Sequence, residues 1–174
     1  MLVAQCLAGD RSAFDQLVDA YQAKLYNAAY RITGSSADAM DATQCAFVKA
    51  FESLRTFDSS RRFFSWIYRI ALNEALNVIG RRRSQSELGE EIPGAEDDPE
   101  QACEAAEVGR CIQTALMSLP EDQRAVLVLR HFNGLSYREI ADVVGVREKT
   151  VKSRLFMARH SLRAILVEQG YLHE

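Results

Sequence analysis

The sequence predicts an all-α protein made of two small helical domains that an acidic, flexible linker joins. Apolar residues recur at helical spacing on both sides of the acidic segment, and no segment alternates apolar and polar residues as a half-buried strand does. Nine glycines and three prolines in 174 residues leave long stretches without helix breakers. Charge divides the chain into three, because residues 85–109 carry nine acids and no base, whereas each flanking segment carries three more bases than acids.

The first domain is predicted over residues 1–84 and begins with a long helix. Its apolar face comprises Phe14, Leu17, Val18, Tyr21, Leu25, Ala28, Ala29 and Ile32. Gly34 ends this helix, and Ser35 with Asp38 resembles a capping box that starts the next one. The apolar face of the second helix is predicted to comprise Phe47, Val48, Phe51 and Leu54. After a break at residues 56–60, a third helix is expected from about Arg61 to Arg83.

The linker is predicted over residues 85–104. It contains Pro93 and Pro99, few large apolar residues and a run of acids. Such a composition does not bury enough apolar surface to fold, and its like charges repel one another and keep the chain extended. Residues 85–100 can span roughly 50 Å at about 3.3 Å per residue, so the two domains can act at sites far apart.

The second domain is predicted over residues 105–174. Its first helix carries Val108, Ile112, Ala115, Leu116 and Leu119 on one face. Residues 118–121 (Ser-Leu-Pro-Glu) indicate a capping box, and Gly134 ends the helix that follows. A second capping box at residues 136–139 opens a short helix, which Gly145 ends, and a last helix runs from about Glu148 to Val167. This order is the helix-turn-helix plan.

The last predicted helix has two different faces. Val151, Leu155, Ala158, Leu162 and Ile165 form an apolar face. The opposite side carries Lys149, Lys152, Ser153, Phe156 and His160. These groups suit phosphates and base edges in a major groove. A plain solvated face is the alternative, and the phenyl ring on this side argues against it.

Four long segments of this sequence resemble parts of one protein family. Residues 135–163 (LSYREIADVVGVREKTVKSRLFMARHSLR) resemble the promoter-reading helix-turn-helix of bacterial sigma factors of the extracytoplasmic function (ECF) type, and residues 119–136 resemble its preceding helix. Residues 41–51 (DATQCAFVKAF) and 57–83 resemble that family's polymerase-binding helix and its helix for the −10 element. The resemblance covers roughly residues 10–84 and 105–168. It implies a transcription initiation factor that binds core RNA polymerase and promoter DNA, both duplex and melted, and that an anti-sigma factor controls.

Two residues depart from the family pattern. Cys45 stands where the family often has an acid, and Arg147 occupies an N-cap position where serine is common. Weaker capping at Arg147 costs about 1 kcal/mol, while its guanidinium gains the ability to bind a phosphate.

The resemblance assigns the polymerase contact to Asp41, Gln44, Phe47 and Val48, which share one side of a helix. A core position is the favoured alternative for Phe47. The contacts assigned to the distal, −35 element are Tyr137, Arg138, Arg147, Lys149, Thr150, Lys152, Ser153, Arg154, Phe156 and Arg159. Their cations are expected to meet phosphates, which makes binding fall steeply with salt.

The third helix of the first domain interleaves aromatic rings with arginines. Rings and guanidinium planes stack on unpaired bases, and Asn73 and Asn77 lie one turn apart where they can hydrogen-bond base edges. The contacts assigned to the −10 element are Arg61, Arg62, Phe63, Trp66, Arg69, Asn73, Asn77, Arg81, Arg82 and Arg83. A core position for Trp66, and simple helix C-terminal charges for the last three arginines, remain alternatives.

The composition also predicts several absences. The cysteines and histidines have no metal-ligand spacing, no cofactor motif is present, and no set of acid, base and nucleophile indicates an enzyme. No apolar run is long enough to insert in a membrane, and the N-terminus makes a poor signal peptide, so a cytoplasmic protein is expected.

Three further interpretations stay open. The first is a two-domain helix-turn-helix regulator that works without core polymerase. The second is an interaction module that has lost DNA binding, against which the intact Lys152, Ser153 and Arg154 argue. The third concerns the acidic segment 85–109, whose nine acids either compete with DNA for the basic faces or merely act as a solubilising spacer.

Overall fold

The computed structural model describes residues 2–87 and 104–171, and these residues form helices and short connections without a strand. The helices are α1 (Leu2–Leu7), α2 (Arg11–Thr33), α3 (Ser36–Ser53), α4 (Phe63–Glu87), α5 (Glu104–Met117), α6 (Glu121–His131), α7 (Tyr137–Val144) and α8 (Glu148–Glu168), with a short 3-10 turn η1 (Leu54–Thr56) after α3. The all-α prediction is confirmed. Among the described residues, no helix is both long and apolar enough to cross a membrane.

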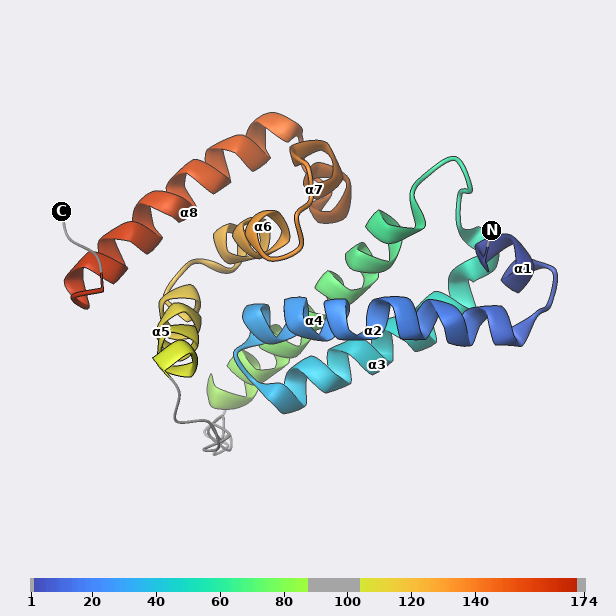
Figure 1. The fold of residues 1–174 in the computed structure, drawn as a ribbon, viewed down its shortest axis with the longest axis horizontal. Coiled ribbons are helices and arrows are strands. Elements are labelled where there is room, and N and C mark those ends of the chain that lie inside the picture. Colours follow the sequence, from blue (N-terminus) through green and yellow to red (C-terminus); the bar gives the residue numbers. More distant parts are fainter. Residues whose placement is uncertain (1, 88–103, 172–174) are drawn as a thin grey trace.

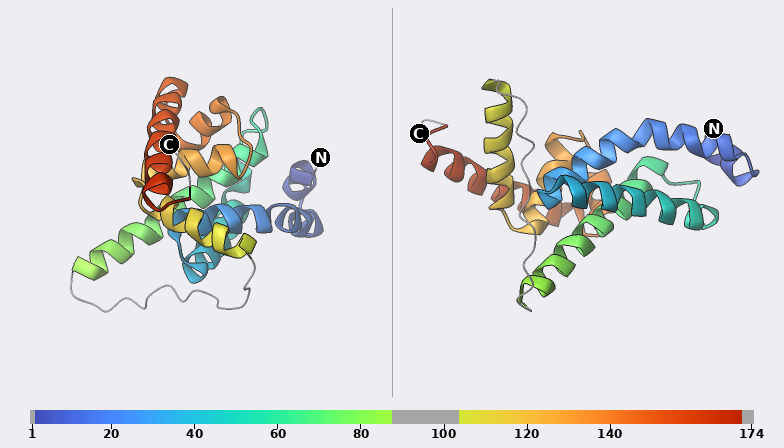
Figure 2. Two further views of the ribbon diagram at one scale, coloured as in Figure 1. Left: turned by 60° about the vertical axis from the view of Figure 1, so that its left-hand side comes forward. Right: turned by 90° about the horizontal axis from the view of Figure 1, so that it is seen from below.

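Helices α2, α3 and α4 pack together into the first helical unit, and α5 to α8 form the second (Figure 1). The predicted face of α2 is confirmed, since Leu17, Leu25 and Ile32 are buried along it. The two units also touch one another. Helix α7 packs on α4, while α5 and α6 pack on α2 (Figure 2). One continuous apolar core therefore runs through both units, from Leu25 in α2 to Ala158 in α8.

Helix α3 buries a different face from the one predicted. Its core side is made of small residues, Ala39, Ala42, Ala46 and Ala50, together with Phe47. Val48 and Phe51 are 57% and 54% exposed, so their assignment to the core face was wrong. The large apolar residues suggested that face, but the short alanine side chains let α3 approach α2 and α4 closely.

Most predicted helix ends are confirmed. The Ser136 hydroxyl accepts from the Glu139 N–H and the Glu139 carboxylate accepts from the Ser136 N–H, which completes the predicted capping box. Gly34 and Gly145 end α2 and α7 with φ angles of 76° and 75°, in the left-handed region that glycine tolerates. Arg147 is the N-cap of α8 and makes no side-chain cap bond, as expected for this departure.

The box predicted at residues 118–121 is not formed. Pro120 is the N-cap of α6, and the Ser118 hydroxyl donates back to the Thr114 carbonyl in α5 instead. The Ser35 cap forms in one direction only, because the Asp38 carboxylate pairs with Arg82. Helix α4 continues to Glu87, so the first residues of the predicted linker are helical. The rest of that linker, and the hypothesis that its acids compete with DNA, lie outside the described residues.

Candidate nucleic-acid interface

Helix α8 presents one polar face to solvent. Lys149, Lys152 and Ser153 are exposed, and the Phe156 ring is 71% exposed although phenylalanine is usually buried. The opposite face is core, because Val151, Leu155 and Ala158 are fully buried against α6 and α7. The predicted division of this helix into two faces is thereby confirmed.

Several cations near this face already have a partner. The Arg154 guanidinium lies 3.0 Å from the Asp122 carboxylate of α6, and the Lys152 ammonium lies 3.3 Å from Glu148 one turn earlier. Arg159 Nε donates to His131 Nε2 at 3.2 Å. Burial lowers the pKa of His131, and the neighbouring Arg159 and Arg130 lower it further. The arginines of this face are thus positioned by α6, while Lys149 has no ion pair among the described residues.

The start of α7 lies beside this face. Tyr137 is half-buried, and the cations of Arg130 and Lys152 lie 5.2 Å and 5.9 Å from its ring. Arg138 is exposed, as are Arg147 and Arg159, whereas Thr150 is half-buried. Helices α7 and α8 therefore bring the predicted −35 contacts together on one side of the second unit.

The aromatic cluster of the first unit surrounds the start of α4. Phe57, Phe63 and Trp66 meet with ring centroids 5.2 to 5.7 Å apart, and all three rings are partly buried. Trp66 packs against the core and also lines a cavity of about 620 Å³. The indole thus serves the core and the surface together. Asn73 and Asn77 are exposed further along the same helix.

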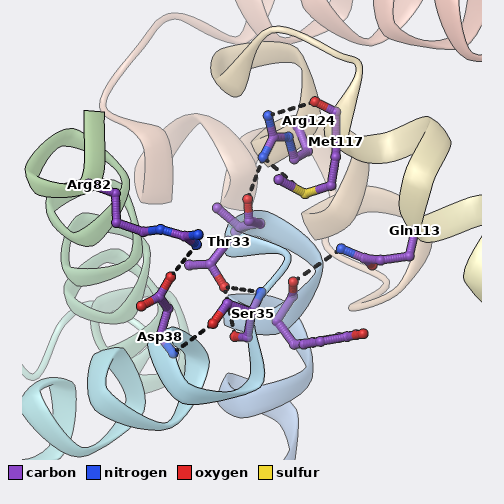
Figure 3. Close-up of polar contacts among 9 residues, drawn as sticks. Thr33, Ser35, Asp38, Arg82, Gln113, Met117 and Arg124 are labelled. Carbon is purple, nitrogen blue, oxygen red and sulfur yellow. Dashed lines mark hydrogen bonds and ion pairs between the residues drawn. The ribbon is translucent and has the colours of Figure 1, made fainter. Parts of the chain in front are cut away.

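The arginines of α4, and the two that directly precede it, mostly face acceptors inside the molecule. Arg62 lies 2.7 Å from the Glu139 carboxylate, Arg69 donates to the Asp142 carbonyl, and Arg83 lies 2.5 Å from Glu121. These acceptors all belong to the second unit. Arg82 pairs instead with Asp38 of α3 at 2.7 Å (Figure 3). Arg61 and Arg81 are exposed, and Arg61 lies 3.6 Å from Asp58.

The predicted polymerase contacts separate into two groups. Asp41, Gln44 and Val48 are exposed along one side of α3. Phe47 is only 9% exposed and its ring meets Phe14 edge-on, so its inclusion in the partner-facing set is corrected to a core role. The sequence reasoning missed Met40, which is 54% exposed and extends the same side toward the N-terminus of α3. Exposed Met and Val on one helix side are the signal that an interface gives.

The structure also reveals a polar junction that the sequence reasoning missed. Arg124 is only 5% exposed, and its guanidinium donates to the carbonyls of Ile32 and Met117 at the ends of α2 and α5 (Figure 3). It also donates to the Leu119 carbonyl. Burial lowers its pKa, and Glu121 opposes that change. No carboxylate among the described residues pairs with it. The ends of α2 and α5 hold this cation, since helix C-termini carry partial negative charge.

Comparison with known proteins now adds to this geometry. The family model described as Sigma-70 region 2 matches residues 17–85, and the one described as Sigma-70, region 4 matches residues 109–162. The ECF RNA polymerase sigma factor SigW of Bacillus subtilis is 33% identical, and the match covers 92% of each chain. The chain belongs to the ECF family of RNA polymerase sigma factors.

Other relatives agree with this membership. The sigma-H factor of Pseudomonas aeruginosa is 38% identical over 92% of this chain and 90% of its own. Among solved structures, CnrH in complex with the cytosolic domain of CnrY is 32% identical, with a TM-score of 0.74 over 96% of both chains. The sigma factor RpoE of Bartonella quintana, in complex with the anti-sigma factor NepR, is 25% identical with a TM-score of 0.74, over 88% of this chain and 96% of that one.

The function of this sigma factor follows from its family. It is a transcription initiation factor that directs RNA polymerase to promoters. This membership does not favour the alternative of a regulator that works without core polymerase. From here the unit α2–α4 is called region 2 and the unit α5–α8 is called region 4.

Proposed function

We propose that this sigma factor divides promoter recognition between its two regions. In the proposal, region 4 reads the −35 element of the duplex with α8, and region 2 binds the melted −10 strand with the start of α4. The exposed side of α3 binds core RNA polymerase. The sigma factor itself catalyses no reaction and acts in the cytoplasm, where the polymerase and its template are found.

The observation that carries the proposal is the two-sided character of α8. This face combines exposed cations and a hydroxyl with a phenyl ring that is unfavourable to leave in water, and it lies on the second helix of a helix-turn-helix. Lys149, Lys152 and Arg147 suit phosphate contacts, whereas Ser153 and Phe156 suit base edges and thymine methyl groups.

Single-strand binding by region 2 is supported by the composition of its surface. Trp66 and Phe63 supply rings for stacking, Arg61, Arg62 and Arg69 supply cations, and the cavity beside Trp66 has room for a base. Arg82 contributes indirectly, because its ion pair with Asp38 fixes α4 against α3.

An anti-sigma partner is also proposed. The RpoE structure contains an anti-sigma factor, and its likeness extends over most of this chain. The exposed apolar side of α3 is a surface that such a partner can cover, and covering it would compete with the polymerase.

The test is transcription with purified core RNA polymerase on a pool of genomic promoter fragments from the source organism. Discrete starts are expected only when the sigma factor is added. Phe156→Ala is expected to lose starts but keep polymerase binding, and Val48→Asp is expected to lose both. Val108→Asp, on an exposed side of α5, is the matched control and should change neither. Absence of both starts and polymerase binding for the wild-type protein would overturn the proposal.

A further inference from the structure

Helix α4 carries a buried acid, Glu74, which is only 9% exposed. It faces α3, which lies beside α4 (Figure 1), and its carboxylate accepts a hydrogen bond from the Lys49 ammonium of α3 at 2.6 Å. Two neighbours of Glu74 on the same helix, Ala71 and Ala75, belong to the apolar core. Burial of a charged group at such a place costs free energy, because the group loses its water.

Packing alone does not require a charge at residue 74. The buried side of α3 is made mostly of small apolar side chains, and an apolar residue on α4 could pack against them as well. A buried ion pair is often no more stable than apolar side chains of similar volume, since the loss of water offsets the attraction between the charges. The carboxylate of Glu74 therefore points to a role besides packing.

A second donor reaches the same carboxylate oxygen. Asn77 Nδ2 donates to Glu74 Oε1 at 3.5 Å, and this is the oxygen that accepts from Lys49. The planar amide of Asn77 has a donor nitrogen on one side and an acceptor oxygen on the other. The reverse orientation would place the amide oxygen against the carboxylate oxygen, so that two acceptors repel one another. Glu74 thus keeps the amide nitrogen of Asn77 turned inward.

We infer that Glu74 is a positioning residue for base recognition by Asn77. The carboxylate orients the amide, and Lys49 holds the carboxylate in place. The Asn77 carbonyl oxygen and its second N–H remain free to hydrogen-bond the edge of an unpaired base, and Asn77 is exposed. This inference rests on the proposed function, which takes Asn77 to contact the melted −10 strand.

The same ion pair joins two functional helices of region 2. Lys49 directly follows Val48, which is exposed on the side of α3 that is proposed to bind core polymerase. Glu74 and Asn77 lie on α4, which is proposed to bind the strand. All of these residues belong to region 2, so the orientation of the Asn77 amide does not depend on how the two regions pack.

An apolar replacement of the whole pair separates a positioning role from a structural one. Lys49→Met combined with Glu74→Leu exchanges the ion pair for apolar side chains, so the free energy of unfolding is expected to stay close to that of the wild type. This double variant offers Asn77 no acceptor. Glu74→Gln is the conservative variant, because its amide oxygen can still accept from both Lys49 and Asn77.

Two further variants complete the set. Glu74→Leu alone guards against misfolding of the double variant, because the Lys49 side chain is 53% exposed and its ammonium can turn to water. Asp19→Leu is the matched control, since it also replaces an acid by leucine but at an exposed position of α2. Urea denaturation followed by circular dichroism reports the folding of every variant.

The experiment measures base preference at each position of the −10 element. Transcription with core polymerase starts from a promoter that the wild-type protein uses, in a pool in which every −10 position is randomised, and the transcribed templates are sequenced. Asn77→Ala identifies the position that Asn77 reads, because the preference is lost there.

The apolar variants are expected to lower the preference at that same position by about fivefold or more, because a misoriented amide loses the hydrogen bonds that discriminate the bases. The preferences at the other −10 positions should stay as in the wild type. Glu74→Gln and Asp19→Leu should keep the wild-type preference at every position.

Two results would overturn the inference alone. One is a wild-type preference at the Asn77 position in both apolar variants, and the other is an equal loss at all −10 positions, which indicates a structural role of the pair. Failure of the proposed function looks different, because it appears without any change at Glu74. If the wild-type protein supports no starts, or if Asn77→Ala alters no position, the strand contact of Asn77 is disproved and the inference with it.

Discussion

The two helices proposed to contact DNA, α4 and α8, present their side chains differently. Helix α8 leaves Lys149, Ser153 and Phe156 in solvent, while Arg154 and Arg159 contact α6. At the start of α4, by contrast, Arg62 and Arg69 face acceptors of the other region, and Trp66 is half-buried at a cavity that α7 borders. The first surface is built within one region, whereas the second is shared with the other region.

This difference follows from how each surface is built. The α8 face is made within one region, so its exposure depends only on the local helix-turn-helix. The arginines at the start and end of α4 meet carboxylates and a carbonyl that region 4 provides. Their surroundings therefore depend on how the two regions pack.

The largest expected effect breaks the buried contact that Arg124 makes between region 4 and the end of α2. Arg124→Met removes the donor to three carbonyls, two of which lie in region 4 and one at the end of α2. Buried acceptors without a donor are costly, so the free energy of unfolding is expected to fall by about 3 kcal/mol.

Urea denaturation followed by circular dichroism measures this change. Arg110→Met on the exposed side of α5 is the control, and it should shift the free energy of unfolding by less than about 0.5 kcal/mol. Equal effects of the two substitutions would contradict the structural role of Arg124.

A moderate effect is expected on the salt dependence of duplex binding by α8. Lys149→Ala removes an exposed cation with no ion pair among the described residues, so the slope of log affinity against log salt for promoter duplex should decrease by about 1. Arg154→Ala should change that slope less, because Arg154 already pairs with Asp122 at 3.0 Å. The measurement is a salt titration of duplex binding for both variants. Equal slopes for them would show that the Asp122 pair does not keep Arg154 from the DNA.

The smallest expected effect depends on pH and involves His131, which accepts a hydrogen bond from Arg159 of α8. Burial and two neighbouring arginines lower the pKa of His131 in the folded protein below its ordinary value of 6.5. The unfolded chain therefore binds the proton more readily, so stability is lost as the pH falls below the unfolded pKa.

Urea denaturation at a series of pH values across this window measures the effect. In His131→Gln the additional loss of stability toward acid should disappear. The same acid dependence in the variant and the wild type would exclude His131 as its source.

The sequence by itself determined the helices, most of their ends and the two faces of α8. These features depend on residues three or four positions apart, or on a single cap such as Ser136 or Gly145, so they are local and can be read in order. The resemblance to sigma factors added the family, and the comparisons confirmed it. The residue assignments for DNA and polymerase remain predictions, with Phe47 moved to the core.

Only the tertiary structure decided which polar groups are free. Arg62 and Glu139 are separated by 77 residues, and Arg124 and Ile32 by 92, so no local pattern pairs them. The same holds for α3, where the choice between alanines and large side chains for the core depends on how closely α2 and α4 approach. Helical periodicity shows that a helix face is apolar or charged. Which other segment that face contacts depends on the packing of residues that are distant in the sequence. The sequence did contain one indication that α6 is buried. Residues 125–129 are apolar on every side of the helix, which is typical of a helix that is buried all round. In the structure, α6 lies between region 2 and the rest of region 4.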